Sequence, residues 1–400
     1  MKILHVVPTY LPAVRYGGPI YSVHALCQAL AAIGHRVHVF TTSVDGPKDS
    51  DVPHNRPVDL DGVQVHYCRS RWLRRLYYSP DLAVQLRLAV GQFDVVHLHS
   101  VFLYPTVVGA RLSARAGVPY VLSPRGMLVR DLIERRSSVT KRAWIRLVER
   151  TNLGQAARIH LTSEEERLAL IDLRLNLAPT AIIPNGVDTP LPFSRQELSA
   201  DLRALGAEGF DVLSFGRISW KKGLDRLIWA MAELPNARAL IAGNDEDGLS
   251  AKLRAVAKDS GVGDRVRFLP RQIGGADKEA LFATARAFAL PSLSENFGNV
   301  VAEAMIRGLP VVVTERVGAA EIVKASGGGL VARSGPEDFA VALAGLLASK
   351  EQLAAMGAKG AAYARERLTW SGIARRFEDL YTEIAGQRSD HSCHGRPVAA

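Results

Sequence analysis

Two carboxylates, Glu295 and Glu303, form the most informative pair of chemically capable residues in the sequence. They lie in the segment PSLSENFGNVVAEAM, with seven residues between them. A Phe-Gly pair predicts a tight turn, and residues 299–307 are expected to form a helix, with Glu295 just before it and Glu303 within it. Backbone N–H groups at a helix N-terminus attract anions, and carboxylates accept hydrogen bonds from hydroxyls. The combination indicates a ligand with both phosphates and hydroxyls, such as a nucleotide-sugar, whereas the plainer interpretation is a polar loop before a surface helix.

A second group of candidates follows a predicted buried strand in the segment SFGRISWKKGL. The strand is expected to end at Gly216 and a helix to begin near Gly223, so Arg217 and Lys222 would emerge at the carboxyl end of the strand. Cations in this place can neutralise the charge that develops on a diphosphate leaving group. Two ordinary surface cations are the alternative, which suits Lys221 better than Arg217.

Further candidates lie at strand ends in the first half of the chain. The pair Gly17–Gly18 precedes a predicted helix, where a glycine backbone can approach a phosphate or a sugar closely. His97 and His99 share one face of a predicted strand; we interpret His97 as a core histidine and His99, at the strand end, as a functional one. Arg125 follows the next strand, and Asn185 lies in a turn expected between two domains.

Composition bounds the class of protein. The 400 residues are 48% hydrophobic and 22% charged, which favours a soluble globular protein of two domains. No apolar run is long enough to span a bilayer. The apolar N-terminal segment is too short to be a signal peptide and is interrupted by Pro8. Three widely spaced cysteines give neither a disulfide framework nor a zinc pattern, so a reducing cytoplasm is expected.

The positive charge is concentrated in the first half. Counting Lys and Arg against Asp and Glu, residues 1–190 carry 23 − 15 = +8 and residues 191–400 carry 27 − 25 = +2. A basic half indicates anionic partners, which include nucleic acid, a membrane surface and phosphorylated substrates. A generally basic soluble protein is the alternative.

Short apolar strands alternate with amphipathic helices twice along the chain. Most of the strands are continuous runs of Val, Ile and Leu, which is typical of parallel strands covered on both faces. The pattern predicts an α/β protein with two doubly wound domains that bind ligands at the carboxyl ends of their strands. The expected strands are residues 2–7, 36–41, 63–67, 94–99, 120–123, 158–161, 181–183, 212–215, 239–242, 266–269, 287–290, 311–313 and 329–331.

The join between the domains is predicted near residues 185–194, where prolines interrupt any regular element. We therefore expect a first domain over residues 1–190 and a second over residues 191–370. A last helix is expected over residues 371–386. The polar residues 387–400 are expected to form a disordered tail.

Together these segments make the chain resemble the retaining GT-B glycosyltransferases, specifically glycosyltransferase family 4 of the bacterial cell-surface polysaccharide type. The resemblance covers nearly the whole chain and is most specific in residues 184–188, 216–223 and 295–303. It implies two Rossmann-like domains that face a cleft, the first on the acceptor side and the second binding the nucleotide-sugar. The C-terminal helix is expected to cross back onto the first domain.

The resemblance also implies roles for the candidate residues. Arg217 and Lys222 would bind the donor diphosphate, Glu303 would bind the ribose hydroxyls, and Glu295 would lie beside the donor sugar. The expected donor-binding residues are Gly17, Gly18, Arg217, Lys222, Glu295, Asn296, Phe297, Gly298, Asn299, Val300 and Glu303. The expected catalytic residues are His99, Arg217, Lys222 and Glu295, and the candidate contacts of acceptor or sugar are Tyr16, Arg125 and Asn185.

The implied reaction moves a sugar from a UDP- or GDP-linked donor to a lipid-linked or polysaccharide acceptor, with retention of configuration and without a metal cofactor. Three Asp-x-Asp sequences, residues 49–51, 59–61 and 245–247, are interpreted as solvated surface. Two basic and aromatic stretches, residues 69–78 and 141–150, suit an anionic membrane surface unless they are ordinary helices packed on the sheet. A cytoplasmic protein at the inner face of the cell membrane is therefore expected.

Two other functions compete with this interpretation. A nicotinamide-dependent dehydrogenase could use similar sheets, but no Gly-x-Gly-x-x-Gly follows the first strand. A basic, non-catalytic nucleic-acid-binding protein would explain the charge but would not need the pair of Glu295 and Glu303. Nucleic acid is therefore not an expected partner.

Overall fold

The chain folds into two compact units. The computed structural model describes residues 1–400 except 14–16, 55, 136–137, 207, 246 and 394–400. Unit 1 contains Met1–Gly186 and Trp370–Ala400, and unit 2 contains Val187–Thr369. The chain therefore passes between the units twice, after Gly186 and after Thr369, where the sequence predicted boundaries after residues 190 and 370.

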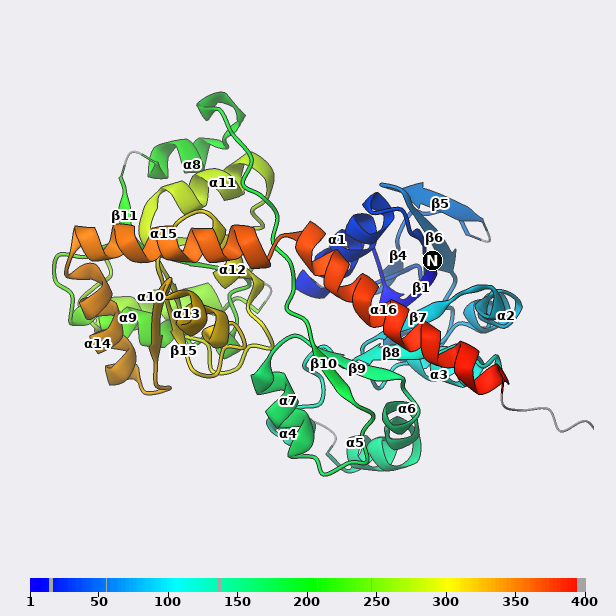
Figure 1. Cartoon of the computed structure of the whole chain (residues 1–400). Coiled ribbons are helices and arrows are strands. Elements are labelled where there is room, and N and C mark those ends of the chain that lie inside the picture. Colours follow the sequence, from blue (N-terminus) through cyan, green and yellow to red (C-terminus); the bar gives the residue numbers. More distant parts are fainter. Residues whose placement is uncertain (14–16, 55, 136–137, 207, 246, 394–400) are drawn as a thin grey trace, which may run out of the picture. The chain divides into compact units, whose positions relative to one another are not determined.

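Unit 1 is built on one twisted sheet with the strand order β10-β9-β8-β7-β1-β2-β6-β5 (Figure 1). The strands pair in parallel, except that the edge strand β5 is antiparallel to β6. The sheet confirms the prediction of parallel strands from continuous apolar runs. The strands are β1 (Lys2–Thr9), β2 (Arg36–Thr42), β5 (Pro57–Leu60), β6 (Val63–Cys68), β7 (Val95–His99), β8 (Tyr120–Ser123), β9 (Arg158–Leu161) and β10 (Thr180–Ile182), beside a small hairpin of β3 (Val44–Asp45) and β4 (Lys48–Asp49).

Helices cover both faces of this sheet. Neighbouring residues of β1 point to opposite faces, so Ile3 belongs to a core with α1 and α16, and Leu4 to a core with α2, α3 and α6. This two-sided burial explains why the strands are apolar throughout. The helices are α1 (Gly18–Ala32), η2 (Arg74–Leu76), α2 (Pro80–Ala89), η3 (Val90–Gln92), α3 (Tyr104–Arg115), α4 (Arg130–Arg135), α5 (Ser138–Trp144), the π-helix η4 (Ile145–Glu149), α6 (Arg150–Gly154), α7 (Glu164–Ile171) and α16 (Trp370–Cys393).

Unit 2 repeats the architecture with a fully parallel sheet in the order β13-β12-β11-β14-β15-β16. Two hydrophobic cores, one on each face, lie between this sheet and its helices. The strands are β11 (Phe210–Phe215), β12 (Ala239–Ala242), β13 (Val266–Leu269), β14 (Ala285–Leu290), β15 (Val311–Thr314) and β16 (Gly329–Ala332). The helices are η5 (Arg195–Glu197), α8 (Ala200–Leu205), η6 (Trp220–Lys222), α9 (Leu224–Ala232), α10 (Leu249–Asp259), α11 (Gly275–Ala283), α12 (Asn299–Ile306), α13 (Ala320–Ser326), α14 (Pro336–Leu347) and α15 (Lys350–Arg367).

Helix α16 differs from the expected helix over 371–386 and disordered tail over 387–400, because it continues to Cys393. The residues from 387 to 393 contain neither Gly nor Pro, so no helix-breaking residue occurs before Gly395. Residues 394–400 lie outside the described part of the chain. The helix supplies Ile373, Phe377 and Tyr381 to the core of unit 1.

Among the described residues, no single helix has the length and apolar character needed to cross a membrane. Helices α14 and α15, which meet at an angle of 100°, satisfy those two criteria only when taken together as a bent pair.

Candidate active site

The loop that carries Glu295 is held in place by backbone hydrogen bonds within unit 2. The Glu295 N–H donates to the Arg316 carbonyl over 3.1 Å, and the Gly318 N–H donates to the Glu295 carbonyl over 3.0 Å. Gly298 precedes α12 with φ 88°, and a Cβ atom on it would lie 3.0 Å from Val317. Only glycine fits this turn easily, so the sequence pattern that predicted a helix start after Gly298 is confirmed.

Lys222 and Glu295 meet in unit 2. The Lys222 Nζ lies 2.7 Å from Glu295 Oε2, and both side chains are mostly buried. Their loops are also joined, because the Leu293 N–H donates to the Lys221 carbonyl over 2.8 Å. A Cβ atom on Gly223, which has φ 57°, would lie 2.4 Å from the Pro291 carbonyl oxygen. The close approach of these loops brings a cation and a carboxylate to the carboxyl ends of β11 and β14.

Arg217 follows β11 and is exposed. It forms no hydrogen bond or ion pair with any residue that the structure describes. Together with Lys222 it lines a small cavity at the carboxyl end of β11. A free guanidinium beside this cavity is available to an anionic ligand.

Glu303 lies in α12 and has one engaged and one free carboxylate oxygen. Its Oε1 is 2.9 Å from Lys278 Nζ, and its buried Oε2 has no hydrogen-bond partner among the described residues. The side chain is 21% exposed. A buried acceptor without a donor is costly, so a ligand hydroxyl that donates to Oε2 would bind favourably.

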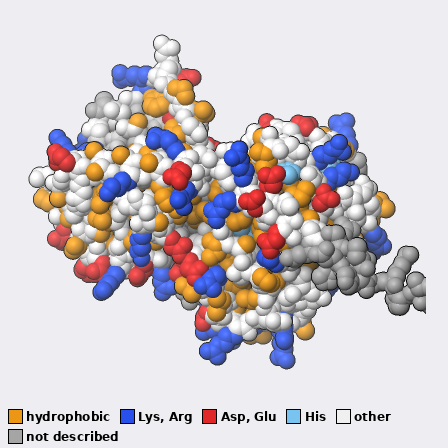
Figure 2. All heavy atoms as spheres, viewed as in Figure 1, with side chains coloured by type: hydrophobic (Ala, Val, Ile, Leu, Met, Phe, Trp, Pro, Cys, Tyr) orange, Lys and Arg blue, Asp and Glu red, His pale blue; other side chains and the backbone are white. Residues whose placement is uncertain are grey.

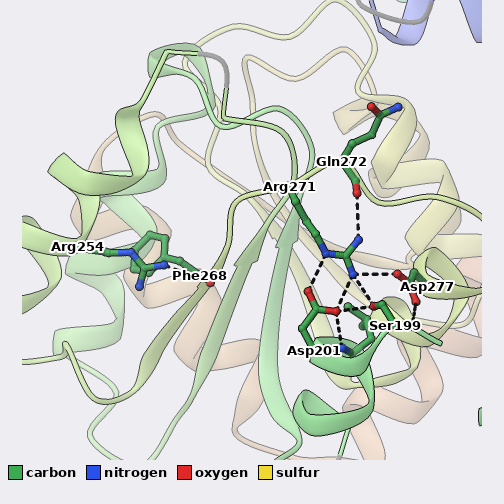
Figure 3. A network of polar contacts seen from close by, with 8 residues as sticks. Ser199, Asp201, Arg254, Phe268, Arg271, Gln272 and Asp277 are labelled. Atoms are coloured by element: carbon green, nitrogen blue, oxygen red, sulfur yellow. Dashed lines mark hydrogen bonds and ion pairs between the residues drawn. The ribbon is translucent and has the colours of Figure 1, made fainter.

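Helix α11, which carries Lys278, is fixed by the residues on either side of it. Asp277 pairs with Arg271 at 2.8 Å, and Glu279 pairs with Arg307, the residue that follows α12. Figure 3 shows Arg271 at the centre of a network in which it also donates to Asp201 and to Ser199. The hydrogen bond from Arg271 holds the pKa of Asp201 well below its usual range. These pairs tie α8, the loop after β13 and α11 together, and they leave Lys278 directed at Glu303.

His99 lies at the carboxyl end of β7 in unit 1, and its side chain is only 1% exposed. Arg125 donates to Nδ1 of His99 over 3.1 Å, and Nε2 of His99 lies 3.0 Å from Nδ1 of His5. Because arginine can only donate, neutral His99 must carry its proton on Nε2 and donate to His5. The proton of His5 then lies on Nε2, a buried atom without a partner.

His97 belongs to a second chain of hydrogen bonds, which confirms that it is a satisfied core histidine. The Ile183 carbonyl accepts from His160 Nε2 over 2.8 Å, so Nδ1 of His160 accepts from the Ser123 hydroxyl at 2.7 Å. The Ser123 oxygen in turn accepts from His97 Nε2 over 2.7 Å, and His97 Nδ1 accepts from the Tyr381 hydroxyl over 2.6 Å. Each histidine in the chain is neutral.

Burial lowers the pKa of all four histidines in these two chains. The pKa of His5 and of His160 falls to about 3, and the pKa values of His97 and His99 lie well below the normal range for histidine. The nearby Arg125 charge acts in the same direction on each of them. Neutral imidazoles are therefore the stable forms at neutral pH.

Three residues at the strand ends of unit 1 have unusual backbone conformations. Ser100, Phe102 and Arg125 have φ values of 73°, 64° and 56°, in the left-handed region that side chains other than glycine rarely adopt. Two buried carboxylates hold these turns: Glu149 accepts from the Phe102 N–H and Glu166 from the Gly126 N–H, both over 2.7 Å. Such strain often accompanies a functional site.

Glu149 and Glu166 were not among the sequence-based candidates. Glu149 also accepts from the indole of Trp144, on the preceding turn, over 2.9 Å. The signal available in the sequence was that Glu149 occupies a position where the helical periodicity of apolar residues predicts a buried side chain. Glu166 is hidden in a run of three glutamates at the start of α7, where acidic residues are common for a different reason.

The remaining candidates of unit 1 fall into two groups. Arg125 donates from NH1 to the Asn185 side chain over 3.2 Å, so His99, Arg125 and Asn185 lie together as one cluster. Gly17 caps α1 with φ 73° and ψ −143°, a conformation that suits glycine, and Gly18 begins the helix. Tyr16 lies outside the described residues.

His5, His97 and His99 are a group of metal-capable side chains, with ligand atoms within 4.8 Å of one another. Their nitrogens are already used in the two hydrogen-bond chains, apart from Nε2 of His5, so a metal ion would have to displace those bonds. In the third Asp-x-Asp sequence, Asp245 accepts from the N–H groups of Leu249 and Ser250 at the start of α10.

Two doubly wound parallel-sheet units with these strand-end loops define the GT-B class of glycosyltransferases. A model of the group 1 glycosyl transferases matches residues 201–363, and a model of the glycosyl transferase 4-like domain matches residues 17–186. A D-inositol 3-phosphate glycosyltransferase of Segniliparus rotundus is 31% identical over 395 residues, which cover 93% of this chain and 86% of that protein. The chain therefore belongs to the group 1 glycosyltransferases with a glycosyltransferase 4-like domain.

Solved structures show the same fold. Sucrose-phosphate synthase of Thermosynechococcus elongatus aligns with a TM-score of 0.75 at 23% identity and covers 96% of this chain and 99% of its own. HepE of Anabaena in complex with UDP-glucose aligns with a TM-score of 0.71 at 22% identity and covers 96% and 100%. These matches confirm the predicted GT-B fold. The family models and the relative from Segniliparus rotundus favour a glycosyltransferase over the dehydrogenase and nucleic-acid alternatives.

Proposed function

We propose that this glycosyltransferase transfers a sugar from a UDP- or GDP-linked donor with retention of configuration, without a metal, to a lipid-linked or polysaccharide acceptor of the cell surface. The observation that carries the proposal is the Lys222–Glu295 ion pair beside the free Arg217 in unit 2. Two cations and one carboxylate meet there at the carboxyl ends of parallel strands, where ligands of such sheets bind. The solved structures of HepE with UDP and with UDP-glucose support a uridine nucleotide as the first donor to test.

The proposed roles in donor binding follow from the pairings within unit 2. The diphosphate is held by Arg217 and Lys222, and the backbone N–H groups from Phe297 to Val300, at the start of α12, contact phosphate or sugar. The ribose hydroxyls donate to the free Oε2 of Glu303. Glu295, which Lys222 orients at 2.7 Å, accepts from a hydroxyl of the donor sugar.

The proposed chemistry is front-face displacement. The bond between the anomeric carbon and the diphosphate oxygen breaks, the acceptor hydroxyl attacks from the same face, and its proton passes to the departing phosphate oxygen. Arg217 and Lys222 stabilise the negative charge on the leaving group. Glu149 and Glu166 are poor candidates for a nucleophile, because their carboxylates are buried and accept backbone hydrogen bonds.

In unit 1 we assign Arg125 and Asn185 to the contact with sugar or acceptor. Both ring nitrogens of His99 are occupied, so His99 contributes by orienting Arg125. Arg125 retains an unpartnered buried Nε–H that can donate to a ligand oxygen. A phosphorylated cyclitol is a second candidate acceptor, because the relative from Segniliparus rotundus is a D-inositol 3-phosphate glycosyltransferase.

We also propose peripheral association with an anionic membrane from the cytoplasmic side. In the stretch 69–78, Trp72 and Leu73 are largely exposed, which suits insertion at an interface. Arg74 is instead engaged with Asp49 and with backbone carbonyls, and Arg69 donates to His54. Arg71 and Arg75 are therefore the cations proposed to contact lipid. Vesicle sedimentation of an Arg71→Ser/Arg75→Ser variant tests this stretch, and unchanged binding would remove it from the membrane surface.

Proton NMR of the first product tests the central proposal. UDP-sugars and GDP-sugars are first screened for slow hydrolysis by the full chain. The accepted donor is then offered with a lipid-linked acceptor and, separately, with inositol phosphate. We expect the product to have the anomeric configuration of the donor, and the opposite configuration would overturn the retaining mechanism.

A further inference from the structure

A cavity of about 610 Å³ in unit 1 has an unusual concentration of arginine. It lies among α4, the region from α5 to α6, and the segment that follows α7. The charged side chains that line it are Arg130, Arg142, Arg146, Arg150, Arg174 and Glu134. Five positive charges face one negative charge, so the cavity is complementary to an anion.

Among the described residues, only two of the five arginines are paired with a carboxylate. Arg130 Nε lies 2.9 Å from Asp172, and Arg142 lies 3.1 Å from Glu134. Arg146, Arg150 and Arg174 form no hydrogen bond or ion pair with the residues that the structure describes. Like charges that share a cavity repel one another, and a bound anion removes this repulsion.

The backbone around these three arginines is also irregular. Arg146 lies in the π-helix η4 and Arg150 begins α6 directly after it. π-Helical turns occur frequently at functional sites. Arg174 has φ 50°, in the left-handed region that is costly for a long side chain. These features are independent of charge and coincide with the same cavity.

The cavity is amphipathic. Its inner wall includes the buried side chains of Ile133 and Ile145. Beside it, Leu147 is 75% exposed and Val139 is 80% exposed. Figure 2 shows hydrophobic side chains and Lys or Arg side chains gathered over the lower end of unit 1, where Figure 1 draws α4 and α5. An anionic group attached to an apolar chain matches this surface better than a free anion does.

We propose that this cavity binds the terminal phosphate of a membrane lipid, with Arg146, Arg150 and Arg174 around the phosphate and with Leu147 and Val139 against the apolar chain. Several guanidinium groups favour a phosphate monoester, which carries more charge and more free oxygens than a phosphodiester. The inference rests on the proposed membrane association and gives it a specific site. Nucleotide-sugar binding, which is proposed for unit 2, is not part of it.

The test uses the full chain and sedimentation with vesicles of phosphatidylcholine that contain phosphatidic acid. The cavity variant is Arg146→Gln/Arg150→Gln/Arg174→Gln. The matched control, Arg87→Gln/Arg111→Gln/Arg115→Gln, removes three exposed arginines of α2 and α3 that do not line the cavity. An arginine near an anionic membrane contributes about 1 kcal/mol, so removing three arginines corresponds to a loss of about 100-fold in partitioning to vesicles. We expect partitioning of the cavity variant to fall by at least about 10-fold and that of the control to change little.

The lipid source is distinguished by two further arms. Vesicles with phosphatidylglycerol at equal surface charge should bind more weakly than those with phosphatidic acid. Excess inorganic phosphate should raise the melting temperature of the wild type by no more than it raises that of the cavity variant. If inorganic phosphate stabilises only the wild type while both proteins bind vesicles equally, the cavity binds a free anion and the proposal is wrong.

Donor hydrolysis separates this proposal from the catalytic one. The cavity variant should hydrolyse the nucleotide-sugar at the rate of the wild type, which shows that it is folded. Equal vesicle binding by the wild type and the cavity variant, or an equal loss in the control, would overturn the cavity as a lipid site. If no nucleotide-sugar is hydrolysed even by the wild type, the catalytic proposal fails while the vesicle result still decides this one.

Discussion

Acidification from pH 7 to pH 5 should destabilise unit 1 selectively. Its core contains four neutral histidines, His5, His97, His99 and His160, whose pKa values burial holds far below the usual range. Adding a proton to either hydrogen-bond chain would place two donors against each other. These histidines therefore stay neutral in the folded unit but take up protons in the unfolded chain.

The magnitude follows from the difference in proton binding. Unfolded histidines titrate near pH 6.5, so the stabilisation is complete above that pH and is lost as the pH falls toward the folded pKa of about 3. Between pH 7 and pH 5 each histidine lowers the unfolding free energy by about 2 kcal/mol, and four lower it by about 8 kcal/mol. This loss is comparable with the whole stability of a typical domain, about 5–15 kcal/mol.

Unit 2 provides an internal control, because residues 187–369 contain no histidine. Differential scanning calorimetry from pH 7 to pH 5 should show one transition moving to lower temperature while the other stays nearly constant. Denaturant titrations over the same range should give an uptake of at least about five protons on unfolding of unit 1 near pH 5. Four come from these histidines and one from His66, whose pKa burial lowers to about 4. The variant His160→Gln should lower that uptake by about one.

Two results would contradict this reasoning. An uptake of one proton or fewer would mean that the histidines are already charged in the folded unit. Parallel destabilisation of both units would assign the effect to carboxylates or to net charge. Either result would remove the directed hydrogen-bond chains as the cause.

The other predictions concern the donor site. Arg217→Ala and Lys222→Ala should each lower kcat by at least about 100-fold while the protein still folds, and full activity in either would remove that residue from the site. Glu303→Ala should mainly raise the donor KM, whereas Glu295→Ala should lower kcat, and normal kinetics in both would refute their placement. Lys278→Met should raise the donor KM as Glu303→Ala does, with recovery in Lys278→Arg, and no change would show that Glu303 needs no partner. Excess EDTA should leave the rate unchanged, and loss that Mg²⁺ or Mn²⁺ restores would reopen the question of a metal.

The fold was largely accessible from the sequence. Continuous apolar runs predicted the parallel strands of both sheets, because burial on two faces removes the need for polar positions. The edge strand β5 was missed, since its sequence PVDL is short, polar in part and begins with proline. The small hairpin of β3 and β4 was missed for the same reason of length.

The sequence predicted the parts of the candidate site that depend on short, local segments. A glycine turn before α12 and the strand-end position of Arg217 depend on short segments and could be predicted. The pairing of Lys278 with Glu303 and the support of Phe102 by Glu149 join distant segments, and no local pattern encodes them. The strand-end position of His99 was predicted, but its burial depends on contacts with Arg125 and His5 that only the folded unit brings about.

Helix α16 has a consequence for how the protein is made. Its Ile373, Phe377 and Tyr381 complete a core that also contains residues of α1 and of the strands β1, β2, β6, β7 and β8. The ribosome delivers these three residues only after the whole of unit 2. During synthesis the apolar surface that α16 covers in unit 1 therefore stays exposed while the sheet of unit 2 is made and folds. Unit 1 is thus the first unit to start folding and the last to complete its core. A nascent chain stalled before Trp370 would expose this apolar surface to chaperones.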